Sequence, residues 1–212
     1  DVTSAGRRRT RFTLKVQDGC AGSCSYCVVR LVRGSPRSTP LRAAVAAARE
    51  ALAAGSGEIV LSGIDVGAYH DVEGAGTAPG GGADLADLVG ALVVLPGLRR
   101  LRLSSIEPEH LDERLLEALA HPRVARHLHV PLQSGDDAVL AAMRRRYSVT
   151  EYLDTAERVR SKLGGAMLST DVIAGFPTED DAAFARTLAL LDGDLFGRVH
   201  VFAYSRRPGT EA

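Results

Sequence analysis

Three cysteines, Cys20, Cys24 and Cys27, lie close together near the start of the chain, and its 212 residues contain no other cysteine. The odd number argues against a disulfide framework, because one bridge would leave a third thiol unpaired. It favours a reducing compartment in which the thiols stay available for chemistry. The surrounding loop, "GCAGSCSYC", is rich in Gly and Ser, which is not typical of inert buried thiols.

Three kinds of site use thiols at this spacing. A structural zinc site needs four ligands, commonly in two separated pairs, and the remaining candidates are scattered histidines such as His70 and His129. A redox pair made by Cys24 and Cys27 leaves Cys20 without a role. A [4Fe–4S] cluster held by three thiolates leaves one iron without a protein ligand, and a reacting molecule needs such an open position. The spacing favours the cluster, with zinc and a redox pair as the alternatives.

The elements that must position this loop alternate between strand and helix. Six segments read as strands, at residues 11–19, 58–63, 98–105, 127–134, 166–176 and 198–205, and helical patterns separate most of them. Such alternation predicts an α/β fold with a parallel sheet and right-handed crossovers. Six units are too few for an eight-stranded closed barrel, so an open partial barrel or a doubly wound sheet is expected. Either fold places its working face at the carboxyl ends of the strands, where the cysteine loop lies.

Composition is ordinary for a globular domain, with 45% hydrophobic and 25% charged residues, and no run is apolar enough to cross a membrane. The charge is uneven, however. Residues 1–50 hold ten Lys or Arg and three Asp or Glu, a net charge of +7, whereas the rest hold sixteen and twenty-three, a net charge of −7. This bias indicates either solvated arginines or a basic rim that meets phosphates. Residues 1–10 are expected to be a linker, and the Gly-rich residues 74–83 a surface insertion.

The C-x3-C-x2-C spacing after a first strand resembles that of the radical S-adenosylmethionine (SAM) enzymes. The resemblance implies a partial (β/α)6 barrel, a parallel sheet with outer helices. It implies that Cys20, Cys24 and Cys27 bind a [4Fe–4S] cluster whose open iron chelates the amino and carboxylate groups of SAM. An electron from the cluster would then split SAM and give a 5′-deoxyadenosyl radical.

Further positions fit the pattern of this superfamily one by one. Tyr26 stands where the family places an aromatic residue near the adenine of SAM, with core packing as the alternative. Ser62 and Gly63 match the position that holds the methionine amino group, and a simple turn is the alternative. Gln133 and Ser134 match the polar position that contacts the ribose, although Ser134 also suits a helix cap.

The last matching motif is "DVIAGFPTE", in which Ile173 and Gly175 resemble the segment that packs on adenine. Gly175 would permit a close backbone approach, and a tight turn before Pro177 is the alternative. Just past the cysteine loop, "RGSPRS" holds Arg33 and Arg37. These are candidates for binding the SAM carboxylate or RNA phosphate, and a solvated basic turn is the alternative.

Longer strings narrow the resemblance to the methylthiotransferases: "KVQDGCAGSCSYCVV", "VRGSPRS", "VPLQSGDDAVLAAMRRRY", "DVIAGFPTE" and "YSRRPGT". The strings "LSGIDVGAY", "SSIEPE" and "HVFAYSRRPGT" look most like the branch that acts on threonylcarbamoyl-adenosine beside the tRNA anticodon. This implies a transferase that inserts a methylthio group at carbon 2 of the adenine. The branches acting on isopentenyl-adenosine or on a ribosomal protein are alternatives, as is a noncatalytic zinc or RNA-binding module.

Members of that family carry two more domains. One holds a second [4Fe–4S] cluster, the sulfur donor, and the other is a small β-domain that binds RNA. Residues 11–212 are therefore expected to be the radical SAM catalytic domain alone. The resemblance further implies a tRNA substrate, an electron donor of the flavodoxin or ferredoxin type, no membrane association and a cytoplasmic location.

Overall fold

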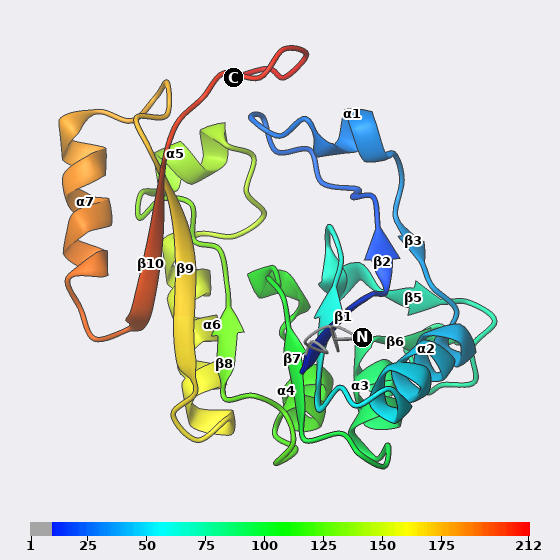
Figure 1. Ribbon diagram of the computed structural model, residues 1–212. Helices are drawn as coiled ribbons and strands as arrows, with labels where there is room; N and C mark the ends of the chain where they lie inside the picture. Colours follow the sequence, from blue (N-terminus) through cyan, green and yellow to red (C-terminus); the bar gives the residue numbers. More distant parts are fainter. Residues whose placement is uncertain (1–9) are drawn as a thin grey trace, which may run out of the picture.

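Six parallel strands form the frame of the molecule in a computed structural model that describes residues 10–212. They pair as two three-stranded sheets, in the orders β1-β4-β7 and β8-β9-β10. A parallel bridge from Ser105, just after β7, to His129 on β8 joins the two sheets, so that strand order follows chain order (Figure 1). The strands are β1 (Arg11–Lys15), β4 (Glu58–Ser62), β7 (Arg100–Leu103), β8 (His127–His129), β9 (Met167–Ala174) and β10 (Phe196–Ala203). This arrangement confirms the expected partial (β/α)6 barrel.

Helices connect successive strands and cover the outside of the sheet (Figure 1). Five of them start at a residue whose side chain accepts a hydrogen bond from the first turn, namely Asp84, Asp112, Asp136, Ser148 and Asp180. The helices are α1 (Val29–Arg33), α2 (Leu41–Ala53), α3 (Leu85–Val93), α4 (Glu113–Leu119), α5 (Asp137–Ala142), α6 (Val149–Lys162) and α7 (Asp181–Leu191), with short 3-10 turns at Val66–Ala68 and Pro108–His110.

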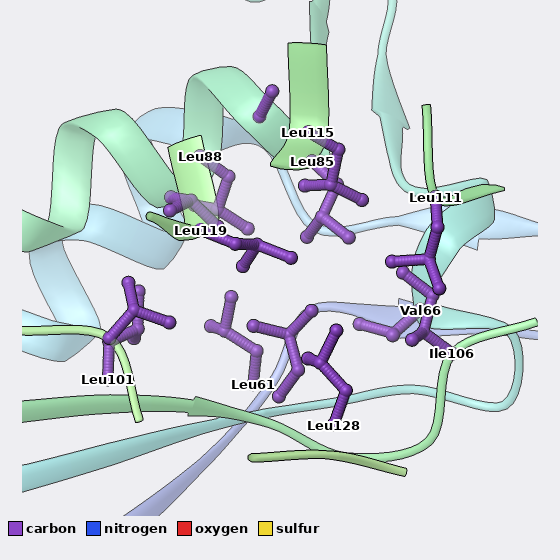
Figure 2. Close-up of a cluster of buried hydrophobic side chains, with 14 of the residues drawn as sticks. Leu61, Val66, Leu85, Leu88, Leu101, Ile106, Leu111, Leu115, Leu119 and Leu128 are labelled. Carbon is purple, nitrogen blue, oxygen red and sulfur yellow. The ribbon is translucent and has the colours of Figure 1, made fainter. Parts of the chain in front are cut away.

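The two faces of the sheet differ because side chains alternate along a strand. One face is apolar and packs beneath the helices, where Leu61, Leu101 and Leu128 meet Leu88 and Leu115 (Figure 2). The other face carries polar and charged side chains, among them Glu58, Arg102, His127, His129, Ser169, Asp171 and His200. The apolar face therefore supplies the core, and the polar face lines the inside of the partial barrel.

Two sequence expectations need correction. The strand expected at 127–134 is limited to His127–His129, since the chain turns into a loop at Pro131. One of the helical patterns between the strands, which begins at Pro108, is split, because Pro108–His110 forms a 3-10 turn and Asp112 then caps α4. The linker expected at 1–10 lies almost wholly outside the described residues. None of the helices within residues 10–212 combines the length and apolarity needed to cross a membrane.

The Gly-rich stretch closes on itself as a small hairpin. Strands β5 (His70–Asp71) and β6 (Ala83–Asp84) pair antiparallel and frame it. Inside, the Thr77 hydroxyl and backbone N–H both donate to the Asp87 carboxylate at 3.1 Å, and Arg114 contacts the same carboxylate. A side chain at Gly76 would lie 2.6 Å from the Cα of Ala83, so glycine is required by packing at that position. The insertion is thus tied to α3 and α4.

Replacing Leu61 by Ala should destabilise the protein by about 3 kcal/mol, because the fully buried side chain would leave a cavity between the sheet and the helices. Urea unfolding of the variant and the wild type measures this difference. The control is Val72→Ala, since Val72 is 75% exposed and its truncation should change stability by less than about 0.5 kcal/mol. Equal effects of the two substitutions would contradict the assignment of the core.

Candidate functional site

The cysteine loop lies between β2 (Gln17–Asp18) and α1, at the carboxyl end of β1. All three thiols are free and partly exposed. The backbone N–H of Gly22 donates to the sulfur of Cys20 at 3.1 Å, and the N–H of Cys27 donates to the carbonyl of Cys24 at 3.1 Å. Short-range hydrogen bonds therefore hold the backbone of the loop at Cys20 and at Cys24–Cys27.

A second segment clamps the base of this loop. Strand β3 (Arg37–Ser38) pairs antiparallel with β2, and the N–H of Cys20 donates to the carbonyl of Gly34 at 3.1 Å. Gly19 has a φ of +76°, and a Cβ there would lie 2.1 Å from the carbonyl oxygen of Ser35. Glycine is the residue that allows both the left-handed conformation and this contact. The "RGSPRS" segment is thus a structural support for the thiol loop.

The buried side chain of Gln17 joins the thiol loop to the loop after β4. Its amide group donates to the carbonyl of Gly19 at 2.8 Å, and its amide oxygen accepts from the N–H of Asp65 at 2.8 Å. A Cβ on Gly63 would lie 2.9 Å from both Cβ and Oε1 of Gln17. Packing alone therefore requires glycine at position 63.

The spacing of the thiols differs from that of ligands gathered around one metal ion. Sulfur ligands of one tetrahedral zinc, at about 2.3 Å from it, would be about 3.8 Å apart. Within residues 10–212, however, His129, Asp171 and His200 are the one set of three metal-binding side chains whose ligand atoms lie within 4.8 Å of one another, and the three cysteines do not form such a set. Wider spacing fits a [4Fe–4S] cluster, in which each thiolate binds a different iron.

The space beside the thiols also fits such a group. A Cβ on Gly22 would lie 3.1 Å from the sulfur of Cys20 and 4.0 Å from that of Cys24, so a side chain there would intrude between them. Burial raises the pKa of the Cys20 thiol, and the neighbouring Asp65, Cys24 and Cys27 raise it further. Thiolates gathered in this way need a cationic group to hold them ionised. The three cysteines therefore fit the cluster that the spacing favours.

Arg145 contacts the cysteine site from the far part of the chain. Its side chain is 6% exposed, and one guanidinium nitrogen donates to the sulfur of Cys24 at 3.4 Å. The same guanidinium pairs with Glu107 and lies 4.9 Å from the centre of the Tyr147 ring. Burial raises the pKa of Glu107, and Arg145 opposes that shift. A permanent positive charge is thus fixed beside one cysteine sulfur.

Further charged groups surround the thiols. Arg144 and Arg146 line the same hollow as Cys20 and Cys24, and they pair with Glu211 and Glu109 respectively. These three arginines, Arg144, Arg145 and Arg146, had no predicted role, although a run of three arginines after an apolar helix is a visible signal. A hollow near Cys24 and Cys27 is also lined by Arg30 and Arg144.

A cavity of about 310 Å³ next to this loop contains three of the residues expected to contact SAM, namely Tyr26, Gln133 and Ile173. Gln133 has a φ of +71°, which is uncommon for a residue with a side chain. Parallel backbone hydrogen bonds hold it there, since its N–H donates to Asp171 and its carbonyl accepts from Ile173. Tyr26 packs edge-on against Phe176, with ring centres 6.3 Å apart, and burial raises the pKa of its phenol.

Other expected site residues lie differently. Ser134 is fully buried, and its hydroxyl contacts the Thr187 hydroxyl on α7 at 3.4 Å, so it faces the helix layer. The carbonyl of Ser62 accepts from the N–H of Val16 at 2.9 Å. Gly175 has a φ of +76° with open space at its Cβ position. Contacts of these three residues with SAM stay predictions.

The two arginines of "RGSPRS" are both exposed. Arg37 donates to the carbonyl of Arg33 at 3.1 Å and to the carboxylate of Asp18 at 3.3 Å, which fastens β3 to the thiol loop. Arg33 ends α1. A larger hollow of about 490 Å³ lies at the opposite, amino ends of β4 and β7 and contains no thiol. The candidate site is therefore at the carboxyl ends.

Comparison with protein families matches residues 14–191 to the radical SAM superfamily. The chain belongs to this superfamily. It follows that the [4Fe–4S] cluster and SAM, which the cysteine spacing and the sequence resemblance indicated, are the cofactors of the chain.

Relatives of known activity come from two branches. The chain is 40% identical over 207 residues to the threonylcarbamoyladenosine tRNA methylthiotransferase MtaB of Thermotoga maritima, which covers 96% of the chain and 46% of that protein. It is 41% identical over 196 residues to the tRNA-2-methylthio-N(6)-dimethylallyladenosine synthase of Herpetosiphon aurantiacus, covering 92% of the chain and 43% of that protein. The chain thus spans less than half of either relative, and their similar identities do not separate the two branches.

Solved structures agree on the fold. The radical SAM methyltransferase TsrM from Kitasatospora setae, with cobalamin and a [4Fe–4S] cluster bound, matches 94% of the chain and 38% of its own length with a TM-score of 0.71 at 16% identity. SuiB of Streptococcus suis, bound to S-adenosylmethionine, matches 94% of the chain and 43% of its own length with a TM-score of 0.61 at 15% identity. At such identities the likeness supports the barrel and no particular substrate.

Replacing Cys20, Cys24 or Cys27 singly by Ala should abolish full cluster occupancy and SAM cleavage, because the chain has no spare cysteine. Iron analysis after anaerobic reconstitution and detection of 5′-deoxyadenosine measure the two effects. Ser23→Ala is the matched control, since Ser23 is an exposed residue of the same loop. A cysteine variant that retains about four irons per chain and makes 5′-deoxyadenosine would refute the ligand assignment.

Replacing Arg145 by Met should lower the reduction potential of the bound cluster, because a positive hydrogen-bond donor to the Cys24 sulfur is removed. Redox titration followed by electron paramagnetic resonance measures the potential. The single variant should also lose about 3–5 kcal/mol of stability through the unpaired Glu107, so the double variant Glu107→Gln/Arg145→Met separates the two effects. Arg146→Met, at a more exposed neighbour, is the control. An unchanged potential in the double variant would leave Arg145 with a structural role alone.

Proposed function

We propose that this chain is the radical SAM part of a tRNA methylthiotransferase that modifies carbon 2 of threonylcarbamoyl-adenosine beside the anticodon. The observation that carries the proposal is the open three-thiol site next to a cavity lined by Tyr26, Gln133 and Ile173. It occurs in a chain that is about 40% identical to two enzymes named as tRNA methylthiotransferases or methylthio synthases.

Cys20, Cys24 and Cys27 would hold the cluster, which supplies the electron that cleaves SAM. The protein's own contribution is placement. Tyr26, with its phenol kept neutral by burial, and Ile173 offer apolar surface suited to a purine ring. Gln133 adds an amide on the same wall. The main catalytic effect expected of such a cavity is to hold SAM and the target carbon close together, in a fixed orientation and away from water.

The choice of branch rests on sequence strings. "LSGIDVGAY", "SSIEPE" and "HVFAYSRRPGT" favour the threonylcarbamoyl branch. A second candidate is the dimethylallyladenosine branch, which is supported by relatives of that name at 39–42% identity over most of the chain. A zinc or RNA-binding module without activity is disfavoured, since the described thiols are not gathered around a single point as one zinc ion requires.

The proposed reaction implies further participants. Transfer of sulfur needs a second cluster, whose ligands must come from outside these 212 residues because their three cysteines are already used. It also needs a tRNA and a low-potential reductant of the flavodoxin or ferredoxin type. A tRNA substrate and oxygen-sensitive clusters together imply a cytoplasmic location.

The experiment uses the chain after anaerobic reconstitution, with SAM, dithionite and anticodon stem-loop RNAs deuterated at carbon 2 of the modified adenosine. One RNA carries the threonylcarbamoyl group and a matched RNA carries the dimethylallyl group. We expect deuterium in 5′-deoxyadenosine from the first RNA and little from the second. No methylthio nucleoside should form, because the chain lacks ligands for a second cluster.

Three outcomes would contradict the proposal. Deuterium transfer from the dimethylallyl RNA alone would move the chain to the other branch. A colourless protein that binds zinc and makes no 5′-deoxyadenosine would favour the noncatalytic module. Methylthio product in catalytic amounts from this chain alone would show that no second cluster outside it is needed.

A further inference from the structure

A continuous chain of hydrogen bonds crosses the inner face of the barrel. It starts at Arg102 on β7 and ends at His200 on β10. In order, the contacts are Arg102 Nη1 to His127 Nδ1 at 3.4 Å, His127 Nε2 to Ser169 Oγ at 2.9 Å, Ser169 Oγ to His129 Nδ1 at 2.9 Å, His129 Nε2 to Asp171 Oδ2 at 3.1 Å, and Asp171 Oδ1 to His200 Nδ1 at 3.1 Å.

Arg102 fixes the direction of the first half of this chain. A guanidinium can only donate, so Nδ1 of His127 must accept and its Nε2 must carry the proton. The Nε2–H of His127 then donates to the hydroxyl oxygen of Ser169. Burial and the nearby Arg102 lower the pKa of His127, which agrees with a neutral ring.

Ser169 passes the same direction to the second half. Its oxygen accepts from the Nε2–H of His127, and its single O–H donates to Nδ1 of His129. His129 therefore carries its proton on Nε2 and donates to Asp171. Burial opposes ionisation of Asp171, but the hydrogen bonds from His129 and His200 hold its pKa below the usual value.

The Asp171–His200 end of this series of hydrogen bonds thus offers hydrogen-bond acceptors. Asp171 is ionised, and His200, which donates through Nδ1, has a lone pair on Nε2. The ring of His200 stacks on that of His129 with centres 5.5 Å apart, and its side chain is 38% exposed. Asp171 lines the same cavity as Tyr26 and Gln133. Asp171 on the cavity wall and the adjacent, partly exposed His200 therefore suit a ligand that brings N–H or O–H donors.

A metal ion at the same place is disfavoured, even though His129, Asp171 and His200 have ligand atoms within 4.8 Å of one another. A metal on Nε2 of His129 would need the proton moved to Nδ1. The Nδ1–H of His129 and the Nε2–H of His127 would then both donate to the Ser169 oxygen, and the Ser169 O–H would lose its acceptor in this hydrogen-bond chain. The direction that Arg102 gives to these hydrogen bonds therefore favours the other tautomer of His129, in which every donor of the series has an acceptor.

We propose that the Asp171–His200 pair is the recognition site for the donor groups of the substrate adenosine, chiefly the N–H that remains on its substituted exocyclic nitrogen. This inference rests on the proposed function. The adenosyl group of SAM offers the same chemistry, and Gln133, which is expected to contact SAM, lies beside Asp171. Ile173, another expected SAM contact on this wall, lies two positions nearer the carboxyl end of β9. At about 3.3 Å per residue, Asp171 lies roughly 7 Å deeper in the barrel.

The test uses nuclear magnetic resonance of the imidazole nitrogens in the metal-free protein, which does not depend on catalysis. We expect the Nε2–H tautomer at His127 and His129 and the Nδ1–H tautomer at His200. Addition of N6-threonylcarbamoyladenosine or N6-dimethylallyladenosine should shift Nε2 of His200 saturably. N6,N6-Dimethyladenosine, which lacks the donor, should bind at least tenfold more weakly.

Two variants distinguish nucleoside binding from SAM binding at this pair. Asp171→Asn, and His200→Phe at the more exposed position, should each weaken nucleoside binding about tenfold and change SAM affinity less than twofold. His70→Phe, at an exposed histidine outside the hydrogen-bond chain, is the matched control. Circular dichroism of each variant checks that it is folded.

Other results would contradict the proposed recognition site. Equal losses for SAM and nucleoside would assign the pair to SAM. A histidine shift with Zn²⁺ at micromolar concentration, in a variant lacking the three cysteines, would assign it to a metal. No nucleoside shift in the folded wild type would overturn the proposal. A chain that binds nucleoside but makes no 5′-deoxyadenosine would instead refute the proposed function alone.

Discussion

One buried amide group organises the site. Gln17, 2% exposed, donates to the thiol loop and accepts from the loop that follows β4, so the two loops cannot move independently. Its presence dictates the glycine at position 63, because a larger residue would collide with it. The N–H of Asp65 is fixed by the same group, and Asp65 in turn pairs with His110 at 3.0 Å. A buried amide that lost these partners would cost roughly 1–3 kcal/mol, which makes this network costly to disturb.

The thiol loop depends on charge balance as much as on backbone geometry. Thiolates and a nearby carboxylate repel one another, and burial strengthens the repulsion. The positive charge of Arg145 offsets the negative charge of a thiolate at Cys24. The cost of burying this guanidinium is offset by its ion pair with Glu107, and the Tyr147 ring lies over the guanidinium. The cost of each buried charge is thus offset by a neighbour, and the whole set is stable only together. The apolar face of the sheet provides the rigid support for this arrangement.

The periodicity of apolar residues predicted the fold, and the spacing of the cysteines predicted a cluster site, because both signals are local. Strand–helix alternation and the cysteine spacing need only residues that are close in the chain. The supporting contacts are not local: Gln17 and Asp65 are 48 positions apart, and Cys24 and Arg145 are 121 apart. No pattern in a single sequence identifies such partners. The same limit applies to Ser134: its ribose contact stays a prediction, and no local pattern indicated that its hydroxyl lies against Thr187 on a distant helix.

The basic bias of the first fifty residues finds a partial structural counterpart at the site. Arg30, from that part of the chain, and Arg144, from the other half of the barrel, line one hollow with Cys24 and Cys27. Positive charge therefore converges on the thiols from two directions. This charge favours ionised thiols at short range, and at longer range it attracts anions in general. Salt screens the long-range attraction more than the short, partly buried contacts. Arg145, which is buried against Cys24, therefore keeps its effect on that thiol at high ionic strength, whereas the effect of the exposed Arg30 and Arg144 weakens as salt is added.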